Sequence, residues 1–198
     1  MKVYGFHFIF SAYGFWLPND PRGSWSDVVR QFALRRFGAA TKVDTTRSVA
    51  HHKHDRQLRL AAKKALRYPP VEFTGVQAVA IAQGFATALT EHDYAVHALA
   101  ILPDHVHLVM AWHPRHIDEI AAHLKAKATA SLSQQGLHPL ARFAGKNGRI
   151  PSPWARNYWC PFITDERHMQ VAIRYVEANP VKAGFKPQRW SLVTPNTA

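Results

Sequence analysis

Residues 94–112 read YAVHALAILPDHVHLVMAW. This stretch decides the fold, because two apolar runs, Tyr94 to Leu102 and His105 to Trp112, are separated only by a Pro-Asp pair that favours a tight turn. The pattern predicts two antiparallel strands. Side chains alternate between the faces of a strand, so His105 and His107 project to the same side. The segment therefore predicts a two-histidine metal clamp.

Elements on either side of this hairpin complete the expected fold. Apolar spacing predicts a strand over residues 3–13, helices over about 74–91, 117–136 and 165–179, and a last strand over 158–163. Thr74 and Gln77 fit a capping box at the start of the first helix. Pro180 predicts that the last helix ends near Asn179, because a residue before proline is disfavoured in helical geometry. Pro161 predicts an edge position or a bulge for the last strand.

The order strand, helix, strand, strand, helix, strand, helix predicts an α+β fold with a ferredoxin-like antiparallel sheet and helices on one face. The length of 198 residues predicts a single domain over 1–198, with a basic insertion at about 17–72. Leu58, Ala61 and Leu66 recur at helical spacing there and predict one short helix. A histidine triplet in the insertion is interpreted as solvated or phosphate-facing: His51, His52 and His54.

The charge of the chain favours a polyanionic partner. Twenty-five Lys and Arg against thirteen Asp and Glu give a formal net charge of +12. Such an excess attracts nucleic acid at long range, and the six Trp offer surfaces on which bases can stack. A basic surface that serves only solubility is the alternative. Nucleic acid is therefore the leading predicted partner.

A single cysteine, Cys160, excludes an intramolecular disulfide and a cysteine-rich zinc site. The apolar opening of the chain lacks the features of a secretory signal, and no segment approaches the roughly 18 apolar residues of a membrane span. We therefore expect a cytoplasmic protein without a membrane partner.

A second motif, YVEANPVKAG, occupies residues 175–184. Tyr175 and Asn179 are four residues apart in a predicted helix and therefore share one face. Alone, they are compatible with a packed tyrosine beside an asparagine that caps a helix end. Alone, His105 and His107 are compatible with ordinary half-buried strand residues. The presence of both motifs in one chain favours a functional site.

Together, LPDHVHL at residues 102–108 and YVEANPVKAG resemble the HUH single-tyrosine (Y1) transposases. These include the IS200/IS605-like transposases and, with closer resemblance, the REP-associated tyrosine transposases. The resemblance covers about residues 3–16 and 74–187 and implies an RRM-like sheet with flanking helices, the HUH endonuclease fold. It also implies a metal-dependent endonuclease that cleaves and rejoins single-stranded DNA near hairpins through a 5′-phosphotyrosine. The basic insertion is longer than in compact members of the family.

The resemblance assigns roles by motif. His105 and His107 are the implied metal ligands, Tyr175 is the nucleophile and Asn179 is the third ligand. Two imidazoles with an amide oxygen suit Mg²⁺ or Mn²⁺, which the family favours, and Zn²⁺ is also possible. Asp104 can orient a ligand or simply form the turn. The implied partner is DNA with a REP-like or insertion-sequence hairpin, bound by a monomer or a homodimer.

Basic and aromatic side chains are the candidates for DNA contacts. The basic candidates are Lys125, Lys127, Arg142, Lys146, Arg149, Arg56, Arg59, Lys63 and Lys64. Each is also compatible with plain solvated surface. The aromatic candidates for base stacking are Trp154, Tyr158 and Trp159, of which at least one is expected in the core.

Two other functions remain compatible with the sequence. One is a basic nucleic-acid-binding domain without catalytic activity. The other is a metal-dependent phosphohydrolase that uses water as the nucleophile. The sequence leaves open the target hairpin, a mobile or domesticated role, and whether the tyrosine helix is exchanged between subunits.

Overall fold

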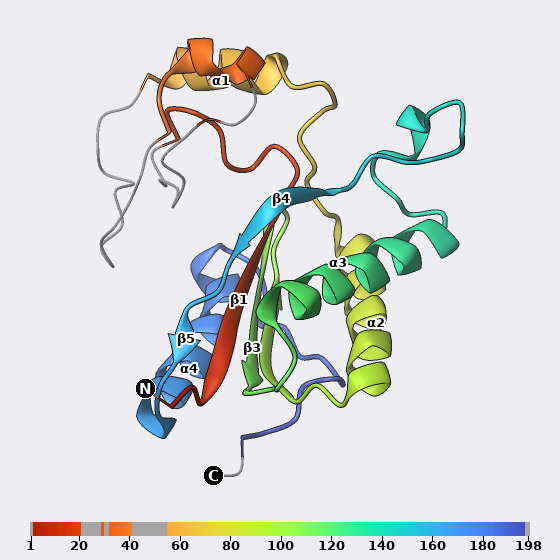
Figure 1. The fold of residues 1–198 in the computed structure, drawn as a ribbon. Coiled ribbons are helices and arrows are strands. Elements are labelled where there is room, and N and C mark those ends of the chain that lie inside the picture. Colours follow the sequence, from red (N-terminus) through yellow and green to blue (C-terminus); the bar gives the residue numbers. More distant parts are fainter. Residues whose placement is uncertain (1, 21–28, 30–31, 41–54, 197–198) are drawn as a thin grey trace.

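A five-stranded antiparallel sheet forms the centre of the protein (Figure 1). The computed structural model describes residues 2–20, 29, 32–40 and 55–196. The strands are β1 (Gly5–Ala12), β2 (Val96–Ile101), β3 (His105–Ala111), β4 (Trp154–Trp159) and β5 (Phe162–Ile163). Their order is β2-β3-β1-β4, and β5 pairs with β1 beside β4. This order confirms the predicted ferredoxin-like arrangement, in which the central strands are β1 and β3.

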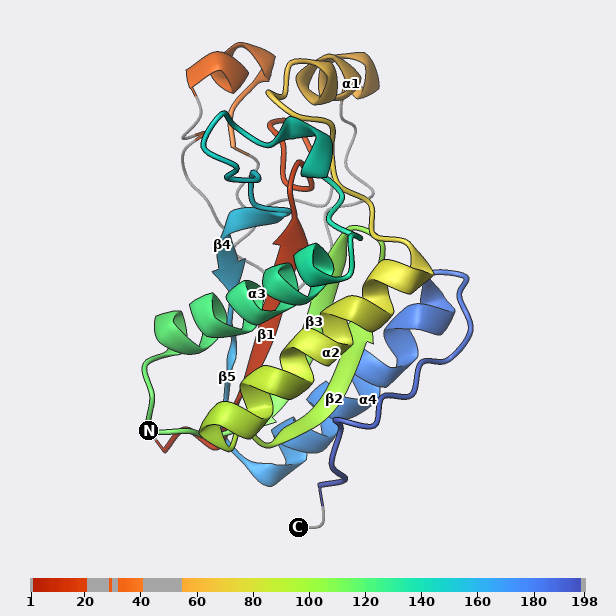
Figure 2. The same ribbon diagram turned by 90° about the vertical axis from the view of Figure 1, so that its right-hand side faces the viewer.

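Helices cover both faces of the sheet, as Figure 2 shows. α2 (Gly75–His92) and α3 (Ile117–Gln134) pack on one face, where they bury a cluster that includes the β1 side chains Phe6, Phe8 and Phe10. α4 (Glu166–Lys182) packs on the other face, against β2 and β3. The expectation of helices on one face was therefore wrong. Apart from His97, β2 is apolar, and its small side chains Ala98 and Ala100 pack in one cluster with Ala172, Ile173 and Val176 of α4.

The ends of the helices follow the predicted caps, with one exception. Thr74 and Gln77 form the capping box, with Thr74 Oγ1 accepting from Gln77 N and Gln77 Oε1 accepting from Thr74 N. α4, however, continues through Pro180 to Lys182. Proline near a C-terminus costs a single backbone hydrogen bond, and the bond from Ala183 N to Asn179 O, at 3.0 Å, keeps the last turn closed.

The last predicted strand is longer and is divided into two. β4 begins four residues earlier than predicted, because the side chain of Trp154 is buried under β1 and its indole Nε1 donates to Thr129 Oγ1 at 3.1 Å. Pairing is interrupted between β4 and β5, where Pro161 accepts a backbone hydrogen bond from His7 N at 3.0 Å through its carbonyl oxygen. The predicted irregularity at this proline is confirmed.

The described part of the basic insertion lies beyond the end of β1, at the top of Figures 1 and 2. It contains the predicted short helix, α1 (Arg56–Lys64), and a short 3-10 helix, η1 (Phe32–Phe37), that was not predicted. Its buried side chains form a small separate core: Leu17, Leu34, Phe37 and Ala62. The histidine triplet at 51, 52 and 54 lies outside the described residues. The boundaries of the insertion and the single domain stay predictions.

The chain after α4 runs along the outer edge of β2. Gln188 binds the backbone of Ile101 twice: its Nε2 donates to Ile101 O at 2.7 Å and its Oε1 accepts from Ile101 N at 2.8 Å. Further along, Thr194 N donates to Val96 O at 2.8 Å. These contacts satisfy backbone groups that an edge strand otherwise leaves open. Among the described residues, no helix is long and apolar enough to cross a membrane.

The contacts of Gln188 lead to a stability prediction. Replacing Gln188 with alanine removes two hydrogen bonds to β2, each worth about 0.5–1.5 kcal/mol. We expect the free energy of unfolding, measured by urea titration, to fall by about 1–3 kcal/mol. The exposed Gln134, at the end of α3, is the control, and Gln134→Ala is expected to change stability by less than about 0.5 kcal/mol. Equal stabilities of the two variants would show that the two Gln188 hydrogen bonds do not contribute to the free energy of unfolding.

Candidate active site

Three imidazoles meet on the face of the sheet that α4 partly covers. His105 and His107 project together from β3, as predicted, with ring centroids 4.9 Å apart. The third imidazole is His7 of β1, whose Nε2 lies 3.0 Å from Nδ1 of His107. His107 is 4% exposed, so it is nearly enclosed by its neighbours. The sequence analysis placed His7 in the first strand and gave it no function.

The register between β1 and β3 brings His7 to this face. Ile9 pairs with His107 and Ser11 with His105, so the odd-numbered side chains of both strands share one face. The alternation within each strand is visible in the sequence. The pairing of two strands nearly a hundred residues apart is not, and without it His7 cannot be assigned to either face.

Tyr175 reaches the imidazoles from α4 of the same chain. Its ring centroid lies 5.6 Å from that of His107 and 6.0 Å from that of His7. The tyrosine is 46% exposed, so a ligand can approach it from solvent. The ammonium of Lys182, further along α4, lies 5.3 Å from the Tyr175 ring centroid and adds positive charge there.

Asn179 lies one helical turn beyond Tyr175. Its Nδ2 atom is buried and makes no hydrogen bond within the described part of the chain. A buried amide without a partner costs about 1–3 kcal/mol. The two ends of an amide are assigned by their surroundings, so the buried atom can equally be the oxygen. An unsatisfied amide at this position fits the predicted role of a metal ligand.

Burial keeps two of the imidazoles neutral. It holds the pKa of His107 well below its usual value, and electrostatic interaction with the neighbouring imidazoles of His105 and His7 lowers this pKa further. Burial, together with the charge of His168, lowers the pKa of His7 to about 4. At pH 7 both rings therefore carry a free lone pair, which is the form that binds a metal.

His105 is oriented by its neighbour in the chain. Its Nδ1 lies 2.7 Å from Oδ1 of Asp104, in a contact typical of the carboxylates that orient metal-binding histidines. Phe15, in the turn after β1, packs against the other side of the ring, with centroids 5.2 Å apart. This contact is the one expected if Asp104 orients a metal ligand. It leaves Nε2 as the ring nitrogen of His105 that can bind a metal.

The predicted metal ligands form a small donor set. Across residues 2–20, 29, 32–40 and 55–196, no three or more His, Cys, Asp or Glu are grouped so that they could hold a metal ion. The predicted set contains only two such residues, His105 and His107, with the amide of Asn179 as the third donor. Solvent and phosphate oxygens would complete the coordination of a hard cation.

Two of the predicted DNA contacts are engaged within the protein. Lys125 Nζ donates to the carbonyl oxygens of Ala155 at 3.0 Å and Asn157 at 3.2 Å, and burial lowers its pKa to about 8. Lys127 forms an ion pair with Glu91. The structure therefore gives Lys125 a role in holding β4 against α3 and does not bring either lysine to the imidazoles.

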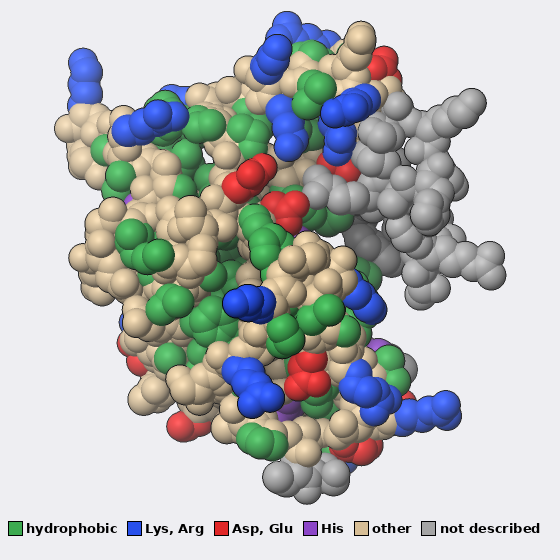
Figure 3. Space-filling model, turned by 180° about the vertical axis from the view of Figure 1, so that it is seen from behind, with side chains coloured by type: hydrophobic (Ala, Val, Ile, Leu, Met, Phe, Trp, Pro, Cys, Tyr) green, Lys and Arg blue, Asp and Glu red, His purple; other side chains and the backbone are tan. Residues whose placement is uncertain are grey.

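The other basic candidates lie at one end of the sheet. Arg142, Lys146 and Arg149 lie in and after the short 3-10 helix η2 (Ala141–Phe143), and the rest lie on α1: Arg56, Arg59, Lys63 and Lys64. Both segments are beyond the end of β1, next to the start of β3 (Figure 2). In Figure 3, lysine and arginine side chains lie over this end of the molecule and also over its lower half.

The three candidate stacking residues separate into core and surface. Trp154 is buried, and Tyr158 packs against Phe8 and Phe10. Trp159 is 41% exposed and pairs with Ile9, which places it on the same sheet face as the imidazoles. The expectation that at least one of the three packs in the core is confirmed, and Trp159 remains the candidate for a base.

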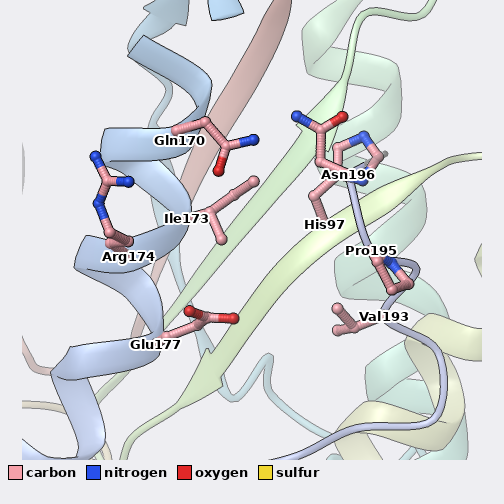
Figure 4. Close-up of a pocket in the computed structure, with 8 residues that line it drawn as sticks. All are labelled: His97, Gln170, Ile173, Arg174, Glu177, Val193, Pro195 and Asn196. Carbon is pink, nitrogen blue, oxygen red and sulfur yellow. The ribbon is translucent and has the colours of Figure 1, made fainter. Parts of the chain in front are cut away.

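A cavity of about 330 Å³ lies between α4 and the C-terminal segment (Figure 4). Its polar lining comes from Gln170, Arg174 and Glu177 of α4 and from His97 and Asn196 opposite. None of the predicted metal ligands lines it, and neither does Tyr175. The cavity is therefore separate from the imidazole cluster.

Comparison with known proteins identifies the family. The family model described as "Transposase IS200 like" (Y1_Tnp) matches residues 71–179, which is more than half of the chain and includes His105, His107, Tyr175 and Asn179. The chain belongs to the IS200-like Y1 transposase family. The predicted family is thereby confirmed.

Individual relatives agree with this Y1 transposase assignment. A protein of Haemophilus influenzae named as a REP-associated tyrosine transposase is 34% identical over 94 residues, which cover 44% of this chain and 50% of the relative. The chain thus matches about half the length of that relative. A solved REP-associated tyrosine transposase bound to a REP hairpin superimposes with a TM-score of 0.50 at 11% identity, over 94% of this chain and 72% of the other. At that identity the likeness shows a shared fold.

Proposed function

We propose that this Y1 transposase is a metal-dependent endonuclease and strand-transfer enzyme that cleaves and rejoins single-stranded DNA near hairpins. Tyr175 is the nucleophile, and His105, His107 and Asn179 hold the cation. The observation that carries the proposal is the half-exposed Tyr175 ring 5.6 Å from the buried His107 ring, centroid to centroid, on a helix of the same chain. Few structural roles bring a solvent-accessible phenol to a cluster of neutral imidazoles.

The chemistry is a reversible transesterification at phosphorus. The phenol oxygen of Tyr175 bonds to the scissile phosphorus while its proton passes to solvent. The bond from phosphorus to the 3′ oxygen breaks, and the 3′ oxygen takes up a proton from solvent to become a 3′-hydroxyl. The polarity of this product follows from the family. A 3′-hydroxyl can attack the phosphotyrosine in the reverse direction, so rejoining needs no ATP.

Members of the family generally use a divalent metal. When bound, such a cation stabilises the charge that develops on the nonbridging oxygens of the phosphate. The donor set of two imidazoles and an amide suits Mg²⁺ or Mn²⁺. The chain itself supplies rigid positions: His107 is nearly enclosed, His105 is oriented by Asp104, and Asn179 is fixed in the last turns of α4.

The substrate is proposed to be single-stranded at the cut and folded into a hairpin beside it. Tyr175 is on the face of a helix, where it meets a flexible backbone more readily than a stacked duplex. One solved relative is bound to a REP hairpin, which supports a hairpin substrate for this chain also. The basic residues of α1 and of the η2 loop are proposed to hold its phosphates.

The direct test is covalent trapping. The full-length protein is incubated with a 5′- and 3′-labelled hairpin oligonucleotide and Mn²⁺ or Mg²⁺, and the adduct is digested and mapped by mass spectrometry. We expect a phosphotyrosine at Tyr175 and a free 3′-hydroxyl on the released strand. DNA binding without an adduct would favour the inactive binding domain. Multiple turnover of a small phosphodiester, without trapped protein, would favour the phosphohydrolase.

Trp159 is expected to stack a base of the bound single strand. Stacking on an aromatic side chain contributes about 1–3 kcal/mol per base, so Trp159→Ala is expected to weaken oligonucleotide binding by about 5- to 150-fold. Fluorescence anisotropy at one fixed salt concentration measures the change. The control is Trp112→Ala, which removes an exposed indole just after β3, at the end opposite His105. Equal losses in the two variants would contradict a specific role for Trp159.

A further inference from the structure

We propose that His7 is a positioning residue that fixes His107 in the tautomer required for metal binding. The proposal rests on the function proposed above, in which His107 is a ligand. His7 Nε2 and His107 Nδ1 are 3.0 Å apart, which is hydrogen-bonding distance between a donor and an acceptor nitrogen. In a pair of neutral imidazoles, one nitrogen carries the proton and the other accepts it.

The ring nitrogen that is left for the cation decides which imidazole donates the hydrogen bond. His105 has its Nδ1 directed at the carboxylate of Asp104, 2.7 Å away, so Nε2 is its metal-binding nitrogen. His107 projects from the same strand to the same face, two residues along. Its Nδ1 lies 3.0 Å from His7 Nε2, so Nε2 is the nitrogen left for a cation, and in that tautomer Nδ1–H donates to His7 Nε2. His7 therefore does for His107 what Asp104 does for His105.

The packing around His7 supports a fixed orientation. Its ring packs against His107, with centroids 5.1 Å apart, and against Tyr175, with centroids 6.0 Å apart, and those two rings also contact each other. It enters from β1, whose hydrogen-bonded register with β3 sets the distance between the His7 and His107 rings. A side chain packed in such a three-ring cluster loses little further freedom when the hydrogen bond forms. His7 touches both the ligand and the nucleophile.

Two substitutions separate hydrogen bonding from packing. His7→Gln keeps an acceptor near the position of Nε2, and His7→Leu fills the space without one. We expect His7→Leu to weaken Mn²⁺ binding by about 10- to 100-fold, as loss of an outer hydrogen-bond partner does, and His7→Gln to stay within about threefold of the unmodified protein. Calorimetric titration without DNA measures both. His97→Leu, which alters a half-buried imidazole of β2 that lies beside the separate cavity, is the control and is expected to leave Mn²⁺ binding unchanged.

Nitrogen NMR of the protein labelled with ¹⁵N-histidine reports the tautomer directly. We expect the metal-free protein to carry the His107 proton on Nδ1, and His7→Gln to preserve this signature. Added Zn²⁺ is expected to shift the Nε2 signals of His105 and His107. A comparable Zn²⁺ shift at His7 Nε2 would make His7 a third histidine ligand and overturn the proposal. Equal losses of Mn²⁺ affinity in His7→Gln and His7→Leu would also overturn it. The tautomer needs no metal or DNA, so the absence of DNA cleavage would leave this measurement unaffected.

Discussion

Replacing Tyr175 with phenylalanine is expected to abolish the covalent protein–DNA adduct. The substitution removes one oxygen atom and keeps the ring contacts with His7 and His107. Without the phenol oxygen no bond to phosphorus can form, so the rate of adduct formation should fall by about 10⁴-fold or more. Denaturing gel electrophoresis of the labelled hairpin measures adduct formation. Binding of the intact oligonucleotide, measured separately, is expected to be unchanged.

A second tyrosine provides the matched control. Tyr158 donates a hydrogen bond to Asp118 and packs on the opposite face of the sheet, against Phe8 and Phe10. Tyr158→Phe is therefore expected to retain adduct formation, with a stability loss of about 1 kcal/mol. An adduct that persists in Tyr175→Phe and disappears in Tyr158→Phe would identify Tyr158 as the nucleophile. Because Tyr158 lies on the opposite face of the sheet, that result would refute the proposed site.

The second large effect is expected from His105→Ala. Loss of a residue that only orients a ligand weakens metal binding by up to about 100-fold, or about 2.7 kcal/mol. His105 is a proposed direct ligand, so its loss should weaken Mn²⁺ binding by more than this. DNA cleavage should fall with it and recover in part when Mn²⁺ is raised. Calorimetry and a cleavage titration against Mn²⁺ concentration measure the two effects.

His113→Ala is the control for this substitution. His113 lies beyond the other end of β3 and contacts the carbonyl oxygen of His92 at 3.1 Å through its Nε2, far from the imidazole cluster. We expect it to bind Mn²⁺ as the unmodified protein does. Full DNA cleavage by the His105→Ala variant at low Mn²⁺ concentration would exclude His105 from the metal site.

The family and the fold could be predicted because their signals are local. The spacing of His105 and His107 in one strand and of Tyr175 and Asn179 in one helix depends only on backbone periodicity. Thr74 and Gln77 act within a single turn, and the capping box is present as predicted. Features of this kind are complete within a few residues, so neighbouring sequence contains all the information they need.

The features that were missed depend on contacts between distant segments. The position of His7 depends on the register of β1 against β3, and the engagement of Lys125 depends on how α3 faces β4. β2 is apolar apart from His97, so its sequence gives no sign of which face α4 covers. The end of α4 was missed for another reason. A residue before proline only tends to avoid helical geometry, and the closed last turn of α4 outweighs that preference at Pro180.

The Gln188 and Thr194 contacts along β2 have a consequence for stoichiometry. With the backbone groups of Ile101 and Val96 already bonded, a second copy cannot lengthen the sheet by adding a strand at those positions. Tyr175 already meets His107 within one polypeptide. The proposed nucleophile and a proposed ligand therefore meet within one chain, and we expect the yield of adduct per molecule to stay constant when the protein is diluted.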